Sequence, residues 1–171
     1  EIAIRIIRAA RELGIEAVAV CSDADVGALH VRMADAHVVI GPAQATKSYL
    51  NTDALLAAAT QVGADAVHPG YGFLAENAGF AERVLDAGLS WVGPSPDAIR
   101  LMGDKIGARA TAQAAGVPTV PGTSESLPDV AAAREAAEQI GYPVAIKASA
   151  GGGGRGIRIV ANAEELTSQY P

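Results

Sequence analysis

The hydrophobic positions in the first part of the chain switch between helical spacing and short continuous runs. Over residues 1–13 apolar side chains recur at three- and four-residue intervals, which predicts an amphipathic helix ended by Gly14. Its predicted apolar face comprises Ile2, Ile6, Ala9, Ala10 and Leu13. Further helices are predicted at 28–33, 51–62 and 78–87, and short strands at 15–20, 37–40, 65–67 and 89–92.

Strands this short and this continuously apolar are typical of a parallel sheet whose two faces are covered by helices. The strand at 65–67 is therefore expected to be buried. The alternation predicts an α/β fold with a doubly wound, Rossmann-like sheet. Because such sheets bind ligands beyond the carboxyl ends of their strands, we expect function in the loops that follow Val20, Ile40, Val67 and Val92.

A composition change divides the chain. Two helical stretches run to residue 115, and a segment rich in Pro, Gly and Ser follows. We place the junction between Gly93 and Pro121, which gives one domain over residues 1–102 and the beginning of a second over 103–171. The chain starts within a predicted helix and ends as another begins, so we interpret it as a fragment of a longer protein.

The second domain is predicted to contain a strand-to-strand connection. Asp129 is expected to cap a helix that Gly141 ends, and strands are predicted at 143–148 and 157–160. A run of glycines joins these two strands, and another helix is predicted to begin after Asn162. This arrangement indicates a hairpin with a glycine-rich tip.

Composition excludes several classes of protein. The net charge is −6, without a block of Lys or Arg, so a nucleic-acid partner is not expected. No apolar run is long enough to span a membrane, and no signal peptide is recognisable, so we expect a cytoplasmic protein. The single Cys21 excludes an internal disulfide and a C-x-x-C metal site, and it is predicted to be a small core residue.

The most informative motif is Lys-Ala-Ser-Ala-Gly-Gly-Gly-Gly-Arg-Gly at residues 147–156. Consecutive glycines let the backbone approach a ligand and point N–H groups at it, which suits a polyphosphate. The motif lacks the Gly-Lys-Ser/Thr ending of a P-loop and joins two strands, so a flap over a nucleotide fits better. A flexible hairpin tip is the alternative, and Lys147 at the strand exit favours an anionic ligand.

Two further segments are candidates for binding. Met-Gly-Asp-Lys at 102–105 places Lys105 in the first turn of a helix, although this motif taken alone fits better with Asp104 as a simple cap and Lys105 as a solvated residue. His-Pro-Gly-Tyr-Gly-Phe-Leu-Ala-Glu-Asn at 68–77 directly follows a predicted strand. This loop is either a binding loop or a rigid turn in which Tyr71 and Phe73 fill a core gap.

Together the motifs resemble the biotin carboxylase domain of the ATP-grasp superfamily. The resemblance rests on Glu-Ile-Ala-Ile-Arg-Ile at the start, the loop at 68–77, Gly-Pro-Ser-Pro-Asp-Ala-Ile-Arg-Leu-Met-Gly-Asp-Lys at 93–105, Ala-Gly-Val-Pro and the glycine motif, in order and at similar spacing. It covers essentially the whole chain. The α subunits of acyl-CoA carboxylases are the most similar by this pattern, followed by pyruvate carboxylase.

The resemblance implies roles for individual residues. Lys105 and Lys147 would contact ATP phosphates. The lid that closes over the nucleotide would contain Gly151, Gly152, Gly153, Gly154 and Gly156. Tyr71 would lie near the biotin site, with Glu76 and Asn77 shaping its wall, and the first helix would place Arg8 and Glu12 at a homodimer interface, unless they are merely solvated helix charges.

The implied reaction is ATP- and bicarbonate-dependent carboxylation of biotin through carboxyphosphate, with Mg²⁺ bridging the phosphates. The implied partners are a biotin carboxyl carrier domain or protein, a carboxyltransferase subunit and a second copy of the enzyme. The first strand of the family and its Asn-Arg-Gly are absent before Glu1, so an unpaired slot is expected in the sheet. The magnesium ligands, the bicarbonate ligands and the general base would lie beyond residue 171, so this chain alone should be inactive.

Three alternatives remain at this point. Another ATP-grasp ligase, such as a carbamoyl-phosphate or glycinamide ribonucleotide synthetase, would share the architecture but use a different acceptor, and the His-Pro-Gly-Tyr loop disfavours it. A noncatalytic dimerisation or docking role is the second. A dinucleotide-binding Rossmann protein is the third, and it is disfavoured because no Gly-x-Gly-x-x-Gly motif follows the first predicted strand.

Overall fold

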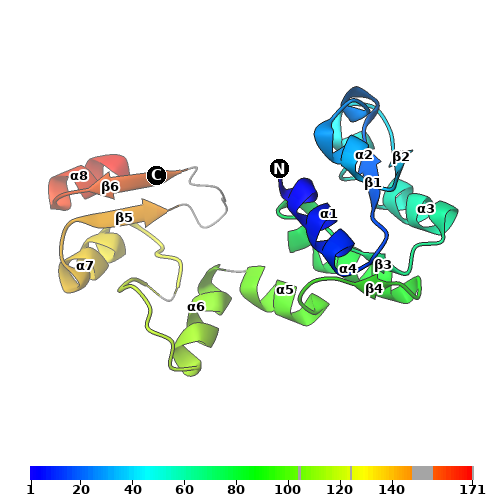
Figure 1. Ribbon diagram of the computed structural model, residues 1–171. Coiled ribbons are helices and arrows are strands. Elements are labelled where there is room, and N and C mark those ends of the chain that lie inside the picture. The colour runs from blue at the N-terminus through cyan, green and yellow to red at the C-terminus, as the bar shows by residue number, and fades with distance from the viewer. Residues whose placement is uncertain (104, 124, 148–155, 171) are drawn as a thin grey trace. The chain divides into compact units, whose positions relative to one another are not determined.

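A computed structural model describes residues 1–103, 105–123, 125–147 and 156–170, except for the side chains of residues 105 and 106 (Figure 1). The chain divides into two compact units, Glu1–Gly103 and Asp104–Pro171. We call them unit 1 and unit 2 and describe each by itself. In the described ranges no helix is both long and apolar enough to cross a membrane.

Unit 1 alternates helices and short strands, as the hydrophobic pattern predicts. Its elements in chain order are α1 (Ile2–Glu12), β1 (Val18–Cys21), η1 (Asp23–Asp25), α2 (Leu29–Met33), β2 (Ala36–Val39), η2 (Ala45–Lys47), α3 (Thr52–Val62), β3 (Ala66–Val67), η3 (Phe73–Glu76), α4 (Ala78–Asp86), β4 (Ser90–Trp91) and α5 (Pro96–Gly103). The three η elements are 3₁₀ turns in loops after β1, β2 and β3.

The strands of unit 1 form two parallel pairs. β1 pairs with β2 from Val18↔Ala36 to Cys21↔Val39, and β3 pairs with β4 through Ala66↔Ser90 and Val67↔Trp91. Among the described residues the two pairs are not hydrogen-bonded to each other, so the sheet is interrupted between them. The α/β class with parallel strands is therefore confirmed, and the interruption agrees with the unpaired slot expected from the sequence.

The predicted burial of the third strand is wrong. Ala66 is exposed and Val67 is only half-buried. A strand of two residues with one partner strand has an open edge, and its side chains receive cover from fewer neighbours than in a sheet interior.

The predicted apolar face of α1 is confirmed only for Ile6 and Ala10, which are half-buried. Ile2 is 42% exposed and Leu13 is 76% exposed, whereas Ile7 is 5% exposed. The sequence offers a second stripe at helical spacing, formed by Ala3, Ile4, Ile7 and Ala10, and this is the stripe that is buried or half-buried. Because both stripes satisfy the same periodicity, packing against α2 and not the pattern decides between them.

One hydrophobic cluster of unit 1 lies between α3, α4 and β3–β4. Its buried members are Leu74, Phe80 and Val84, and the ring of Phe80 meets Trp91 edge to face at a centroid distance of 5.7 Å. Burying such a side chain fully contributes about 1.5–3 kcal/mol. Asn51 and Asn77 cap α3 and α4 by accepting hydrogen bonds from backbone N–H groups.

Unit 2 begins with α6 (Lys105–Ala114) and continues with α7 (Val130–Ile140), β5 (Val144–Lys147), β6 (Ile157–Val160) and α8 (Ala163–Gln169). β5 and β6 form the predicted antiparallel hairpin, which lies against α7 and α8 (Figure 1). The core here consists of Ala133, Ala137, Val160 and Leu166.

The predicted helix boundaries of unit 2 are confirmed by their caps. Asp129 accepts a hydrogen bond from the N–H of Ala132 at 2.8 Å, and Gly141 ends α7 with φ of 90°. Asn162 accepts from two N–H groups at the start of α8. Since Ala has no side chain able to accept these bonds, replacing such a cap weakens a helix by about 1 kcal/mol.

Candidate functional site

One face of the β5–β6 hairpin is covered by unit 2's own helices, and the other is open. The strand register places Ala145 opposite Ile159 and Lys147 opposite Ile157 on the same face. Ile159 is 73% exposed and Ile157 is 43% exposed, and Ala145 and Lys147 are exposed as well. We call these four residues the hairpin face. The alternate positions, Val144 and Val160 among them, pack toward α7 and α8.

The hairpin face combines an apolar surface with one positive charge. Two exposed isoleucines side by side on a sheet form an apolar surface. A flat ligand that covers this surface removes it from water, which favours binding. The ammonium group of Lys147 has no acidic partner in the described part of the structure. A molecule with an aromatic base at one end and phosphates at the other matches this combination. The isoleucines would contact the base and Lys147 would attract the phosphates.

The other residues predicted to bind a nucleotide are placed only in part. Lys105 opens α6, as expected, and its side chain lies outside the described part of the structure. Gly151, Gly152, Gly153 and Gly154 also lie outside the described residues. Gly156 directly precedes β6 with φ of 75°, a backbone conformation that favours glycine.

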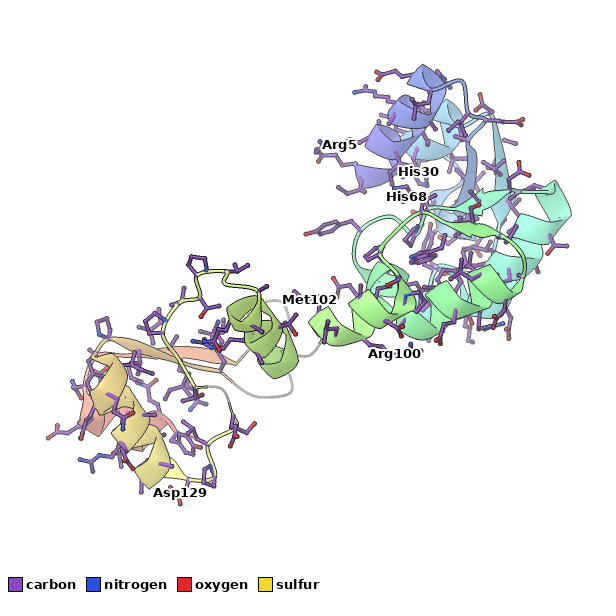
Figure 2. All side chains as sticks on the ribbon, turned by 90° about the horizontal axis from the view of Figure 1, so that it is seen from below. Arg5, His30, His68, Arg100, Met102 and Asp129 are labelled. Carbon is purple, nitrogen blue, oxygen red and sulfur yellow. The ribbon has the colours of Figure 1, made fainter. Side chains whose placement is uncertain are left out.

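The loop at 68–77 leaves the carboxyl end of β3, where a parallel α/β unit binds ligands. Its first turn is closed by His68, labelled in Figure 2, whose Nδ1 accepts a hydrogen bond from the N–H of Gly70 at 3.1 Å. Tyr71 is 86% exposed and Phe73 is 66% exposed. The interpretation that these two rings fill a core gap is therefore wrong, because Leu74 occupies the core instead.

Phe73 has a strained backbone. Its φ is 47°, and in the described part of the chain it is the one residue other than glycine with a positive φ. A bulky side chain in this left-handed region is a rare outlier that costs on the order of 1–3 kcal/mol. Gly70 and Gly72 on its N-terminal side have φ of 78° and 76°, so the chain turns sharply into η3.

Glu76 and Asn77 lie where η3 meets α4. Glu76 ends η3 and is exposed one residue before the cap of α4. The side-chain oxygen of Asn77 accepts a hydrogen bond from the N–H of Phe80 at 2.8 Å. Asn77 therefore fixes the start of α4, and Glu76 is the freer of the two side chains.

Arg8 and Glu12 lie one turn apart on α1, and both are exposed. Neither side chain has a hydrogen-bond or ion-pair partner within the described ranges of this chain. Both are thus available to a second molecule, which the predicted interface requires.

A hydrogen-bonded cluster that no sequence motif indicates joins the loops after β1 and β2. Oδ2 of Asp25 accepts hydrogen bonds from the hydroxyl groups of Tyr49, at 2.5 Å, and of Ser22, at 2.7 Å. The Tyr49 oxygen in turn accepts from the N–H of Ser22 at 2.9 Å. These donors lower the pKa of Asp25, while burial and the bond to Asp25 raise the pKa of Tyr49. No spacing rule connects residues 24 apart, so only the fold reveals this cluster.

Cys21 lies next to this cluster and is fully buried, as predicted. Burial, with a smaller contribution from the charge of Asp25, raises the pKa of its thiol. The thiol is therefore a core group and not a nucleophile.

No group of three or more His, Cys, Asp or Glu side chains that could hold a metal ion occurs in the residues that the structure describes.

Family comparisons identify the class of protein first. Residues 104–170 match the family described as "Carbamoyl-phosphate synthase L chain, ATP binding domain". The fold of the chain matches the N-terminal part of biotin carboxylase structures, which are ATP-grasp enzymes. Residues 1–99 match "Biotin carboxylase, N-terminal domain". The chain belongs to the biotin carboxylase family.

Curated relatives agree with this assignment. The chain is 56% identical to the biotin carboxylase of Pseudomonas aeruginosa over 167 residues, which are 97% of this chain and 37% of that protein. It is 51% identical over 170 residues to the 2-oxoglutarate carboxylase small subunit of Hydrogenobacter thermophilus, covering 99% of this chain and 36% of that protein. The chain thus spans less than two fifths of the length of these relatives.

Solved structures similar to this chain are also biotin carboxylases. A biotin carboxylase from Campylobacter jejuni in a β,γ-ATP complex superimposes with a TM-score of 0.90 at 47% identity, covering 99% of this chain and 38% of that one. A second structure is the biotin carboxylase domain dimer of the Hydrogenobacter thermophilus 2-oxoglutarate carboxylase, in complex with MgADP, ADP and bicarbonate. It superimposes with a TM-score of 0.87 at 50% identity, and the match covers 99% of this chain and 37% of that one.

Proposed function

We propose that this chain supplies part of the ATP site and part of the acceptor site of a biotin carboxylase. The observation that carries the proposal is the hairpin face, where Lys147 stands beside Ile157 and Ile159 on an open, otherwise apolar surface. The adenine base would lie on the isoleucines, and Lys147 would contact the phosphates together with Lys105 and the glycines at 151–154 and 156. The resemblance of the sequence motifs supports the roles given to Lys105 and to the glycines.

The proposed reaction has two steps. An oxygen of bicarbonate attacks the γ-phosphorus of ATP, the bond from that phosphorus to the bridging oxygen breaks, and ADP and carboxyphosphate form. The ureido nitrogen of biotin then attacks the carboxyl carbon, and its proton passes to the phosphate that leaves. The bond from that carbon to the phosphate oxygen breaks, which gives carboxybiotin and inorganic phosphate.

Positive charge is the contribution of this chain to the first step. Phosphoryl transfer depends on positioning and on neutralising the charge of the phosphate oxygens, and a lysine at the end of a strand provides a fixed charge. Mg²⁺, when bound, would neutralise charge on the phosphate oxygens, and the resemblance places its carboxylate ligands outside residues 1–171.

The proposed acceptor site includes the loop at 68–77 of unit 1, with Tyr71 and Glu76 facing the biotin. Biotin would arrive on a carrier domain or protein, and a carboxyltransferase subunit would pass the carboxyl group on. We further propose a cytoplasmic enzyme of the acyl-CoA carboxylase type, serving fatty acid biosynthesis, that forms a homodimer through α1 with Arg8 and Glu12 at the interface. The exposure of both side chains supports this interface.

The test uses a hybrid enzyme in which this chain replaces the matching segment of the Pseudomonas aeruginosa biotin carboxylase. We expect ADP release that depends on both biotin and bicarbonate. Lys147→Ala should raise the KM for ATP about tenfold or more, because a charge-assisted contact to a phosphate is lost. Its melting temperature should not change, since Lys147 is exposed.

Lys47→Ala is the matched control, because Lys47 is an exposed lysine in a loop of unit 1. It should leave both the KM for ATP and the melting temperature unchanged. An equal effect of the two substitutions would remove Lys147 from the site. ADP release driven by an amine and not by biotin would point to a carbamoyl-phosphate synthetase type of ligase.

A further inference from the structure

The 68–77 loop contains an aromatic residue that the motif assignments leave without a role. Phe73 combines two unfavourable properties: its ring is 66% exposed, and its backbone φ is 47°. A residue whose only task was to form this turn would be Gly or Asn, which adopt positive φ more readily. The bulky ring therefore needs a different explanation.

The neighbours of Phe73 explain how the strained conformation is held. On the C-terminal side Leu74 is 7% exposed and packs in the core with Phe80 and Val84. The carbonyl of Gly72 accepts a hydrogen bond from the N–H of Ala75 at 2.9 Å, which closes the first turn of η3. With Leu74 anchored inward, the preceding side chain is directed out of the core.

The exposed ring lies in the part of unit 1 where a ligand is expected. Tyr71, two residues earlier, is 86% exposed in the same loop, and the loop follows the carboxyl end of β3. Two aromatic side chains in water, one of them on a strained backbone, lose nothing structural when they are covered by a ligand and gain apolar contact. Strain that the surrounding structure maintains is typical of binding sites.

We propose that Phe73 is a binding residue for the acceptor, and that its strained backbone holds the ring ready to contact the fused, largely apolar ring system of biotin. This proposal rests on the function proposed above and adds a residue to its acceptor side. Binding of biotin would explain both why the ring is exposed and why the backbone keeps a left-handed conformation.

The test compares Phe73→Gly with the parent in the hybrid enzyme. Glycine suits the left-handed backbone, so the melting temperature should stay the same or rise. The KM for free biotin should increase about fivefold or more, because an aromatic contact is lost, while the KM for ATP should not change. Phe73→Tyr should keep the KM for biotin close to the parent value, because the ring is retained.

Phe73→Asn provides a second variant that also tolerates a positive φ. Leu85→Ala, which truncates an exposed apolar residue on α4, is the control and should change neither KM. An unchanged KM for biotin in both Phe73 variants, or a lowered melting temperature with an unchanged KM, would show that the ring has a structural role and overturn the proposal. If the parent hybrid releases no ADP in response to biotin, the proposed function itself fails, so the two failures are distinguishable.

Discussion

Unit 1 and unit 2 present their candidate binding residues in different ways. In unit 1 the candidates lie in loops, because parallel strands need crossover helices that cover the faces of the sheet and leave the strand ends open. In unit 2 the hairpin face lies on the strands themselves, because an antiparallel hairpin needs no crossover, and α7 and α8 cover one face only. The type of strand pairing thus decides whether an end or a face is available to a ligand.

The largest expected effect tests whether the two units are stabilised separately. Leu166 is 1% exposed in the core of unit 2, so Leu166→Ala should lower the free energy of unfolding of this unit by about 2–5 kcal/mol. Hydrogen exchange should show faster exchange of the amides in β5 and β6 and unchanged exchange in β1 and β2.

Ile159→Ala is the matched control for this comparison, since it removes apolar atoms from the same hairpin on its 73% exposed face. It should leave the exchange rates of both units unchanged. Faster exchange in β1 and β2 of Leu166→Ala would mean that the units unfold together.

A smaller effect is expected from the cluster that joins the loops of unit 1. Tyr49→Phe removes the oxygen that accepts from the N–H of Ser22, and Ser22 is 1% exposed. Leaving that buried donor unpaired should cost about 1–3 kcal/mol. Urea unfolding monitored in unit 1 measures this change, and Tyr71→Phe, at an exposed ring, should show none.

The smallest effect is a pH dependence of the same cluster. Hydrogen bonds from Tyr49 and Ser22 lower the pKa of Asp25 in the folded state. A group with a lowered folded pKa adds stability above its unfolded pKa, near 3.9, and loses it as pH falls through the folded value. In Asp25→Asn the free energy of unfolding should therefore fall less steeply than in the parent as the pH is lowered below about 4. Asp23→Asn is the neighbouring control, and a flattening of equal size there would contradict the role of the cluster.

The sequence predicted most elements of both units because their signals are local. Asn51 and Asp129 cap helices through contacts three residues away, and glycines such as Gly63 end helices with a positive φ. The loop at 68–77 was found as a candidate site for the same reason, since its composition and its place after a strand are visible in the chain itself.

The predictions that failed depended on contacts between distant segments. The apolar stripe through Ile2 and the stripe through Ile7 have the same period, and only the packing of α1 selects the second. Whether Tyr71 and Phe73 enter the core depended on Leu74, which takes that place instead. The Asp25 and Tyr49 contact joins residues 24 apart, and no local pattern encodes it.

The sequence by itself determined the family, the order of the elements and the residues with which most helices begin and end, because motifs, caps and periodicity act over a few neighbours. Only the tertiary structure decided which faces are covered, that the hairpin leaves Lys147 on an open apolar face, and that Phe73 stands in solvent with φ of 47°. The physical reason is that burial and strain are set by the sum of contacts from separate elements, which no local pattern contains.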